Sequence, residues 1–110
     1  MRQIVIDELS PMESDNLDSY LKRTLQAGPL IGLFWLVMPP EQLSDIQQAH
    51  EGCSPYYCAV ELENSRLKVE LLVRSSSNLH CDCIAHATKD QRRFILHFID
   101  RMLEEEQISA

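Results

Sequence analysis

The run from Leu30 to Met38 constrains the fold more than any other segment, because it contains no polar side chain. Pro29 and Pro39 bound it, and proline interrupts regular backbone hydrogen bonding on both sides. An apolar run of this length is typical of a strand that is buried on both faces. A membrane-spanning helix would need about 20 residues. We therefore expect a central strand whose faces are covered by helices or by a partner.

Capping boxes predict where two helices begin. Ser10 precedes Pro11 and is followed, three residues on, by Glu13. Thr88 is followed in the same way by Gln91. After the second start, apolar side chains repeat at three- and four-residue spacing, which indicates a helix packed on a sheet. These residues are Phe94, Ile95, Phe98, Ile99, Met102 and Leu103.

The remaining pattern predicts four more strands and one short helix. Residues 3–6 form a β-branched run, and apolar and polar side chains alternate over 56–63, 67–74 and 79–86. A short helix is expected over 41–51, with Leu43, Ile46 and Ala49 on its inner face. The order is strand-helix-strand-helix-strand-strand-strand-helix.

This order predicts an α+β fold. We expect a mixed, mostly antiparallel five-stranded sheet with helices packed on it, in a single domain covering 1–110. The first strand-helix-strand unit could form a right-handed parallel crossover.

Charge and composition exclude several classes of partner. The formal net charge is −7, whereas phosphate backbones and anionic membranes require clustered lysine and arginine. We therefore expect neither nucleic acid nor membrane as a partner. A signal peptide is not evident, because Asp7 and Glu8 interrupt the start of the chain. We expect a cytoplasmic protein whose four cysteines are free thiols or metal ligands.

The cysteines suggest a metal site. Cys81 and Cys83 lie two residues apart, and Cys53 and Cys58 form an upstream pair close to His50. Thiolate sulfur is a ligand that zinc selects. We predict Cys53, Cys58, Cys81 and Cys83 as a candidate zinc set. Free cysteine is also among the most buried residue types, so the sequence favours simple packing of these thiols in the core.

A second polar group lies on the other face of the predicted strand over 79–86. His80, Asp82 and His86 point away from the cysteines there, and Glu61 or Glu63 could lie across from them. These residues form an alternative metal site. The competing interpretation is a solvated polar face, which antiparallel sheets commonly have.

Catalysis has little support in the sequence. Cys53 is the best candidate for a reactive thiol or redox sensor, but Glu51 nearby disfavours its thiolate. The chain shows no glycine-rich phosphate loop and no Gly-x-Ser-x-Gly motif. We therefore lean towards a domain without enzymatic activity.

Association is the function that the sequence favours. A strand with two apolar faces either receives a helix on each face or leaves one face for a partner. Phe34, Leu36 and Met38 are the predicted interface residues. The preferred hypothesis is a small non-catalytic domain that acts as a homodimer or adaptor, with zinc binding as the alternative.

Overall fold

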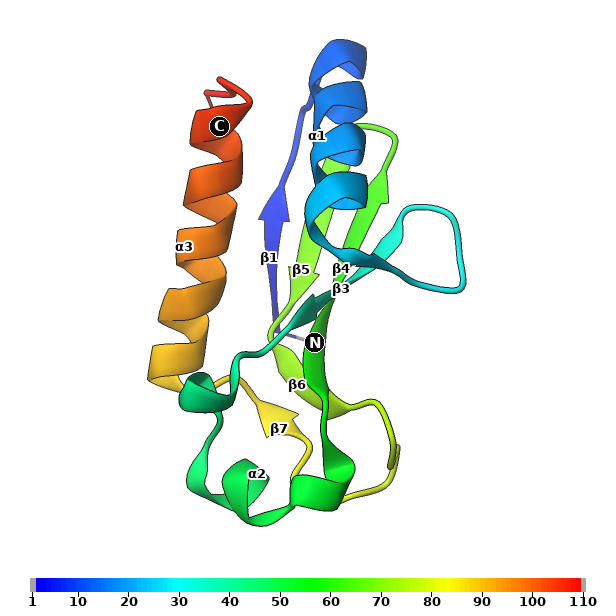
Figure 1. The fold of residues 1–110 in the computed structure, drawn as a ribbon. Coiled ribbons are helices and arrows are strands. Elements are labelled where there is room, and N and C mark those ends of the chain that lie inside the picture. The colour runs from blue at the N-terminus through cyan, green and yellow to red at the C-terminus, as the bar shows by residue number, and fades with distance from the viewer. Residues whose placement is uncertain (1, 110) are drawn as a thin grey trace.

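The computed structural model describes residues 2–109 and confirms the α+β class (Figure 1). Three α-helices and two short 3-10 helices combine with seven strands in this part of the chain. The elements are β1 (Gln3–Ile6), α1 (Pro11–Thr24), β2 (Gln26–Ala27), β3 (Leu33–Val37), η1 (Pro40–Gln42), α2 (Asp45–Ala49), η2 (Glu51–Cys53), β4 (Tyr56–Glu63), β5 (Arg66–Glu70), β6 (Leu72–Ser75), β7 (Ala85–His86) and α3 (Lys89–Glu105). Both predicted capping boxes are present, at Ser10 and at Thr88.

The sheet is antiparallel throughout, with the order β1-β5-β4-β3-β2; β6 pairs with β4, and β7 with β6. It has seven strands rather than five for two reasons. The chain after α1 forms β2, which pairs with β3 as a hairpin, and Leu71 interrupts the predicted strand 67–74 and divides it into β5 and β6. The parallel crossover is wrong, because β1 pairs with β5, and both β5 and β4 lie between β1 and β3.

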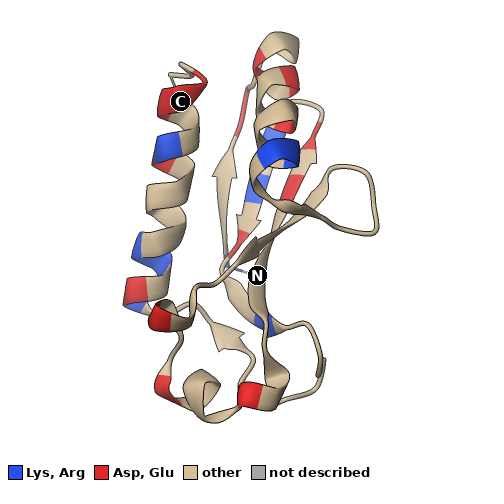
Figure 2. Ribbon diagram, in the orientation of Figure 1, with Lys and Arg blue, Asp and Glu red and all other residues tan. Residues whose placement is uncertain are grey.

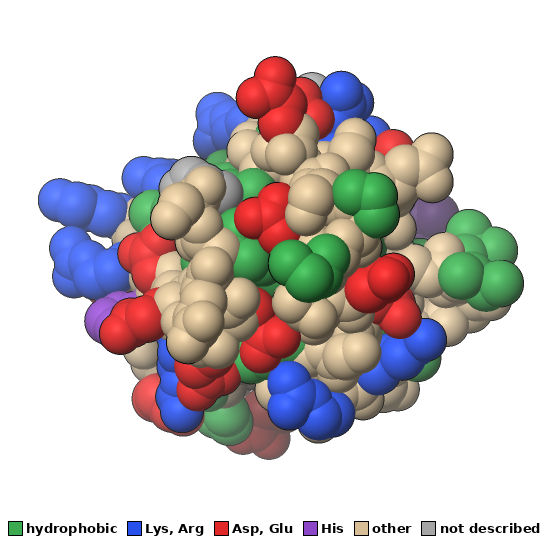
Figure 3. Space-filling model, turned by 90° about the horizontal axis from the view of Figure 1, so that it is seen from above, with side chains coloured by type: hydrophobic (Ala, Val, Ile, Leu, Met, Phe, Trp, Pro, Cys, Tyr) green, Lys and Arg blue, Asp and Glu red, His purple; other side chains and the backbone are tan. Residues whose placement is uncertain are grey.

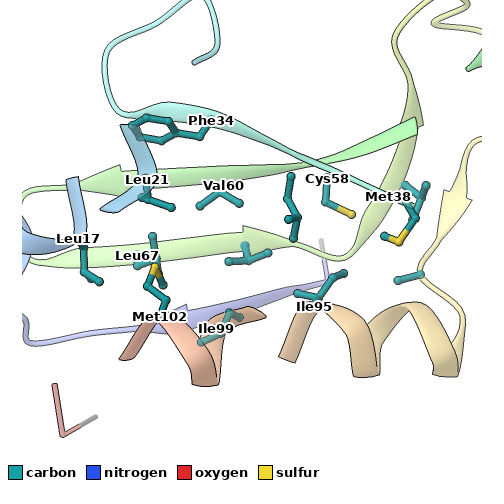
Figure 4. Close-up of a cluster of buried hydrophobic side chains, with 14 of the residues drawn as sticks. Leu17, Leu21, Phe34, Met38, Cys58, Val60, Leu67, Ile95, Ile99 and Met102 are labelled. Atoms are coloured by element: carbon teal, nitrogen blue, oxygen red, sulfur yellow. The ribbon is translucent and has the colours of Figure 1, made fainter. Parts of the chain in front are cut away.

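The hydrophobic core lies between one face of the sheet and the two long helices. Leu17 and Leu21 of α1 and Ile99 of α3 are buried in the same cluster as Val60 and Leu67 of the sheet (Figure 4). Each of these five side chains is at most 2% exposed. Burying a large aliphatic side chain stabilises a fold by about 1.5–3 kcal/mol. This layer is the main source of stability that the structure shows.

The second face of β3 is only partly covered, contrary to expectation. Leu33 and Trp35 are half-buried on that face, and Val37 is 44% exposed. Trp35 packs on Tyr57 of β4, with ring centroids 4.5 Å apart. Both long helices use the opposite face, so the apolar run has one buried face and one face that is open to solvent.

The three predicted interface residues need correction. Phe34, Leu36 and Met38 are 2–4% exposed and belong to the core under the helices. They are on the helix side of β3 because side chains alternate along a strand. In the isolated chain they offer no surface to a partner.

The first residues of the apolar run form a loop instead of a strand. Leu30 is 70% exposed and Ile31 is fully exposed at the tip of the β2–β3 hairpin. Gly32 has φ +82°, and a side chain there would collide with the carbonyl oxygen of Leu62. Viewed from above, apolar side chains stand out at the right edge of the molecule, on the side where Figure 1 places this loop (Figure 3).

The helix predicted over 41–51 is divided into three short pieces. Ser44 caps α2 through a capping box with Gln47, so the helix begins anew there. The new start places Gln47 inside, whereas Ile46 and Ala49 are exposed. The predicted inner face was therefore wrong for two of its three residues.

The strand predicted over 79–86 is mostly a series of turns. Only Ala85–His86 pair with β6, while residues 76–84 bend back on themselves. The buried Ser75 hydroxyl accepts hydrogen bonds from the backbone N–H groups of Ser77 and Asn78, which turns the chain there. Leu79 consequently lies outside and is 68% exposed.

Charged residues of both signs occur along α3, where lysine and arginine are interspersed with acidic residues (Figure 2). Arg93 pairs with Asp90, and Arg101 with Glu105, at 3.6 and 3.5 Å. Exposed pairs of this kind contribute little to stability. Over residues 2–109, no helix combines the length and apolar character needed to cross a membrane.

Candidate metal centre

Four metal-ligating side chains converge at the lower end of the molecule in Figure 1, where α2 and β7 lie. They are His50, Cys53, Cys81 and Cys83, and their potential ligand atoms all lie within 4.8 Å of one another. Cys53 and Cys83 are buried, while His50 and Cys81 are half-buried. The set offers three sulfur atoms and one imidazole nitrogen, which is a donor combination typical of structural zinc.

The distances suit one ion. The sulfur atoms of Cys81 and Cys83 are 2.8 Å apart, and His50 Nδ1 is 3.0 Å from Cys81 Sγ. Around tetrahedral zinc, with Zn–S near 2.3 Å, two sulfur ligands lie about 3.8 Å apart. These two sulfur atoms would therefore have to move apart by about 1 Å to accept the ion.

Local backbone structure brings each pair of ligands together. His50 ends α2 and precedes η2, and the N–H of Cys53 donates to the His50 carbonyl at 3.0 Å. Side chains three residues apart in a 3-10 turn lie on the same side, which aligns His50 with Cys53. Cys81 and Cys83 share a tight turn, closed by the N–H of Ile84 donating to the Cys81 carbonyl at 3.1 Å.

Buried polar side chains hold the backbone at three of the four ligands. Gln47 Nε2 donates to the Cys83 carbonyl at 3.2 Å, and the Tyr56 hydroxyl reaches the His50 carbonyl at 3.0 Å. The hydroxyl of Ser75 donates to the Cys53 carbonyl. None of these bonds requires a metal ion. The ligand positions are consequently fixed by the fold before any ion binds.

The sulfur atoms influence one another electrostatically. The pKa of Cys81 is lowered to about 6, chiefly because the Cys83 thiol and backbone N–H donate to its sulfur, with help from His50. The pKa of Cys53 is raised to about 11 by its bond with Cys81 and by burial. The lowered pKa of Cys81 favours its thiolate, which is the form in which cysteine binds metals.

The structure brings together three of the four predicted zinc ligands. Cys58 lies elsewhere, opposite Leu36 in the β3–β4 ladder, fully buried in the core. Burial raises the pKa of its thiol to about 12, which suits packing rather than ligation. His50 takes the fourth position instead. Its spacing of three residues from Cys53 was the available signal for including it.

The alternative polar group is not part of this cluster. His80, Asp82 and His86 are exposed on the turns and on β7, and none of them is among the four converging residues. Glu61 lies on β4 and pairs with Lys68 of β5. A separate site at these residues stays a prediction.

Comparisons with known proteins do not add a role. No protein-family model, no curated protein and no solved structure matches this chain.

Proposed function

We propose that this domain binds one zinc ion through His50, Cys53, Cys81 and Cys83. One observation carries the proposal: four donor atoms converge from two segments of the chain. His50 in the first segment and Cys81 in the second are 31 residues apart in the sequence. Three sulfur atoms favour zinc over hard cations such as magnesium and calcium, which take oxygen ligands. A reducing cytoplasm, which would keep these thiols free, is part of the proposal.

The proposed role of the ion is structural. Four protein ligands fill a tetrahedral shell, whereas catalytic zinc keeps a position open for water or substrate. The ion would join the α2–η2 segment to the turns over 76–84, which have little regular hydrogen bonding of their own. Metal binding would thus add a cross-link between two segments that buried hydrogen bonds already hold close together.

Metal analysis of matched variants tests this function. The wild-type chain, produced with zinc and dialysed, is expected to hold one zinc per chain by plasma mass spectrometry. Cys83→Ala and His50→Ala are expected to lose the ion, because each removes one of the four donors. Cys58→Ala is the matched control and should keep it. Metal-free wild-type protein, or equal loss in the control, would contradict the proposal.

Association remains a second candidate, at a different surface from the one predicted. The open face of the sheet carries Trp35, Val37 and Tyr57, partly exposed and without a covering helix. Apolar patches of this kind commonly mark interfaces. A dimer at micromolar concentration in light scattering, reduced by Val37→Lys, would support this role. A monomer without a partner would count against it.

A further inference from the structure

A buried tyrosine lies beside the proposed zinc ligands and is not itself one of them. Tyr56, at the start of β4, is 1% exposed. Its hydroxyl oxygen lies 3.0 Å from the His50 carbonyl oxygen, 3.2 Å from the Gln47 carbonyl oxygen and 3.2 Å from Cys83 Sγ. A phenol has one proton to donate, so these three acceptors compete for it.

The competition depends on the state of Cys83. In the metal-free chain the Cys83 thiol itself donates to Cys81 Sγ, and a neutral thiol is a weak acceptor. The His50 carbonyl is then the better partner for the phenol. When a metal binds, the thiol proton of Cys83 leaves to solvent and the sulfur becomes a thiolate. Hydrogen bonds to an ionised acceptor are roughly twice as strong as neutral ones.

We infer that the Tyr56 hydroxyl turns towards Cys83 Sγ when metal binds and acts as the outer-shell donor of the site. This inference rests on the proposed zinc site. Tyr56 is a positioning residue: it strengthens the metal-bound state more than the metal-free state and thereby raises affinity. Outer-shell partners of metal ligands typically contribute about 10–100-fold in affinity.

Hydrogen bonds with neighbouring residues hold Tyr56 and Cys83 in position relative to each other. The main-chain carbonyl of Gln47 accepts a hydrogen bond from the Tyr56 hydroxyl. The side-chain amide of Gln47 donates to the main-chain carbonyl of Cys83. Gln91, from α3, donates to Gln47 Oε1 at 2.8 Å. The phenol and the main chain of Cys83 are thus both bonded to Gln47, so the inference needs only rotation of the Tyr56 O–H bond.

Cobalt serves as the spectroscopic probe, because its thiolate charge-transfer band reports the electron density on sulfur. Tyr56→Phe should move this band to lower energy and weaken zinc binding about 10–100-fold in a chelator competition. Tyr57→Phe, the adjacent residue on the opposite face of β4, is the matched control and should change neither. An unchanged band and affinity in Tyr56→Phe would overturn the inference while leaving the zinc site intact. A wild-type chain that binds neither ion would overturn both.

A graded test avoids dependence on the folding of Tyr56→Phe. Replacing the tyrosines with 3-fluorotyrosine keeps the hydroxyl and makes it a stronger donor. The cobalt band should then move to higher energy, opposite to the effect of phenylalanine. Tyr20 packs on Phe98, far along α3, and Tyr57 on Trp35, so Tyr56 is the tyrosine whose change reaches the sulfur. A band that does not move with the fluorinated protein would also overturn the inference.

Discussion

Different interactions stabilise the two ends of this molecule. The sheet-and-helix body, formed by α1, α3 and β1–β5, depends on aliphatic side chains such as Leu21, Val60 and Ile99. The sulfur end, formed by residues 40–56 and 72–88, contains short helices and turns around the cysteines. Apolar burial stabilises the long packed elements, whereas the short segments of the sulfur end also use hydrogen bonds from buried polar side chains.

The buried polar side chains are concentrated at the sulfur end of the molecule. Within residues 2–109 the buried polar side chains are Gln47, Ser75 and Gln91, and all three belong to the hydrogen-bond network around the sulfur end. Each is satisfied, and buried side-chain nitrogen or oxygen atoms without a partner are not found in the described chain. Satisfied buried networks specify one arrangement of the chain. This network therefore prepares the ligand positions.

A cavity in the body should have the largest effect on stability and none on the metal. Leu67→Ala removes a fully buried side chain and is expected to lower the free energy of unfolding by about 2–5 kcal/mol. Urea denaturation measures this change. Zinc content should stay at one per chain, and a parallel loss of zinc would show that the two ends are not separable.

Removing the metal should lower stability through the sulfur end of the molecule. Zinc at about 100 times its dissociation constant adds about 2.7 kcal/mol to stability, which a chelator would abolish. Hydrogen exchange should quicken over 50–53 and 76–84, while β4 and β5 keep their protection. Uniform acceleration across the chain would contradict a local role for the ion.

Gln91 connects the two ends and should give an intermediate effect. It closes the capping box of α3 and also donates to Gln47 Oε1. Gln91→Ala would leave a buried acceptor without its donor, at a cost of about 1–3 kcal/mol in unfolding free energy. Thr88→Ala, which disturbs the cap alone, is the control and should cost about 1 kcal/mol. Equal costs would mean that the network contributes nothing beyond capping.

The hairpin tip should give the smallest effect. Ile31→Ser replaces a fully exposed side chain, so its stability should stay within about 0.5 kcal/mol of wild type. Thermal unfolding and zinc content should both match the parent chain. A large loss of stability would show that Ile31 is buried in solution, for example against a second copy of the chain.

Local signals predicted the regular elements well. Ser10 and Thr88 begin the two long helices as their capping boxes indicated, and alternation located β4 and β5. These features depend on residues close together in the sequence. The number of strands was underestimated by two, because β2 has only the residues Gln26 and Ala27 and Leu71 divides the predicted strand 67–74 into β5 and β6.

The candidate site was predictable only in part. Cys53, Cys81 and Cys83 could be chosen from residue type, but Cys58 has the same chemistry, and only the tertiary fold separates it from them. Alternation suggested a strand over 79–86, whereas the hydroxyl of Ser75 turns the chain just before that segment. Because this bond depends on a buried serine in β6, sequence periodicity did not reveal it.

X-ray absorption spectroscopy at the zinc edge would identify the atoms that bind the proposed ion. The predicted shell has three sulfur atoms at about 2.3 Å and one nitrogen at about 2.0–2.1 Å, from the three cysteines and His50. A shell of four sulfur atoms would contradict the account, because it would require Cys58 to leave the core. A shell of nitrogen and oxygen alone would place the ion outside the cysteine cluster and contradict it as well.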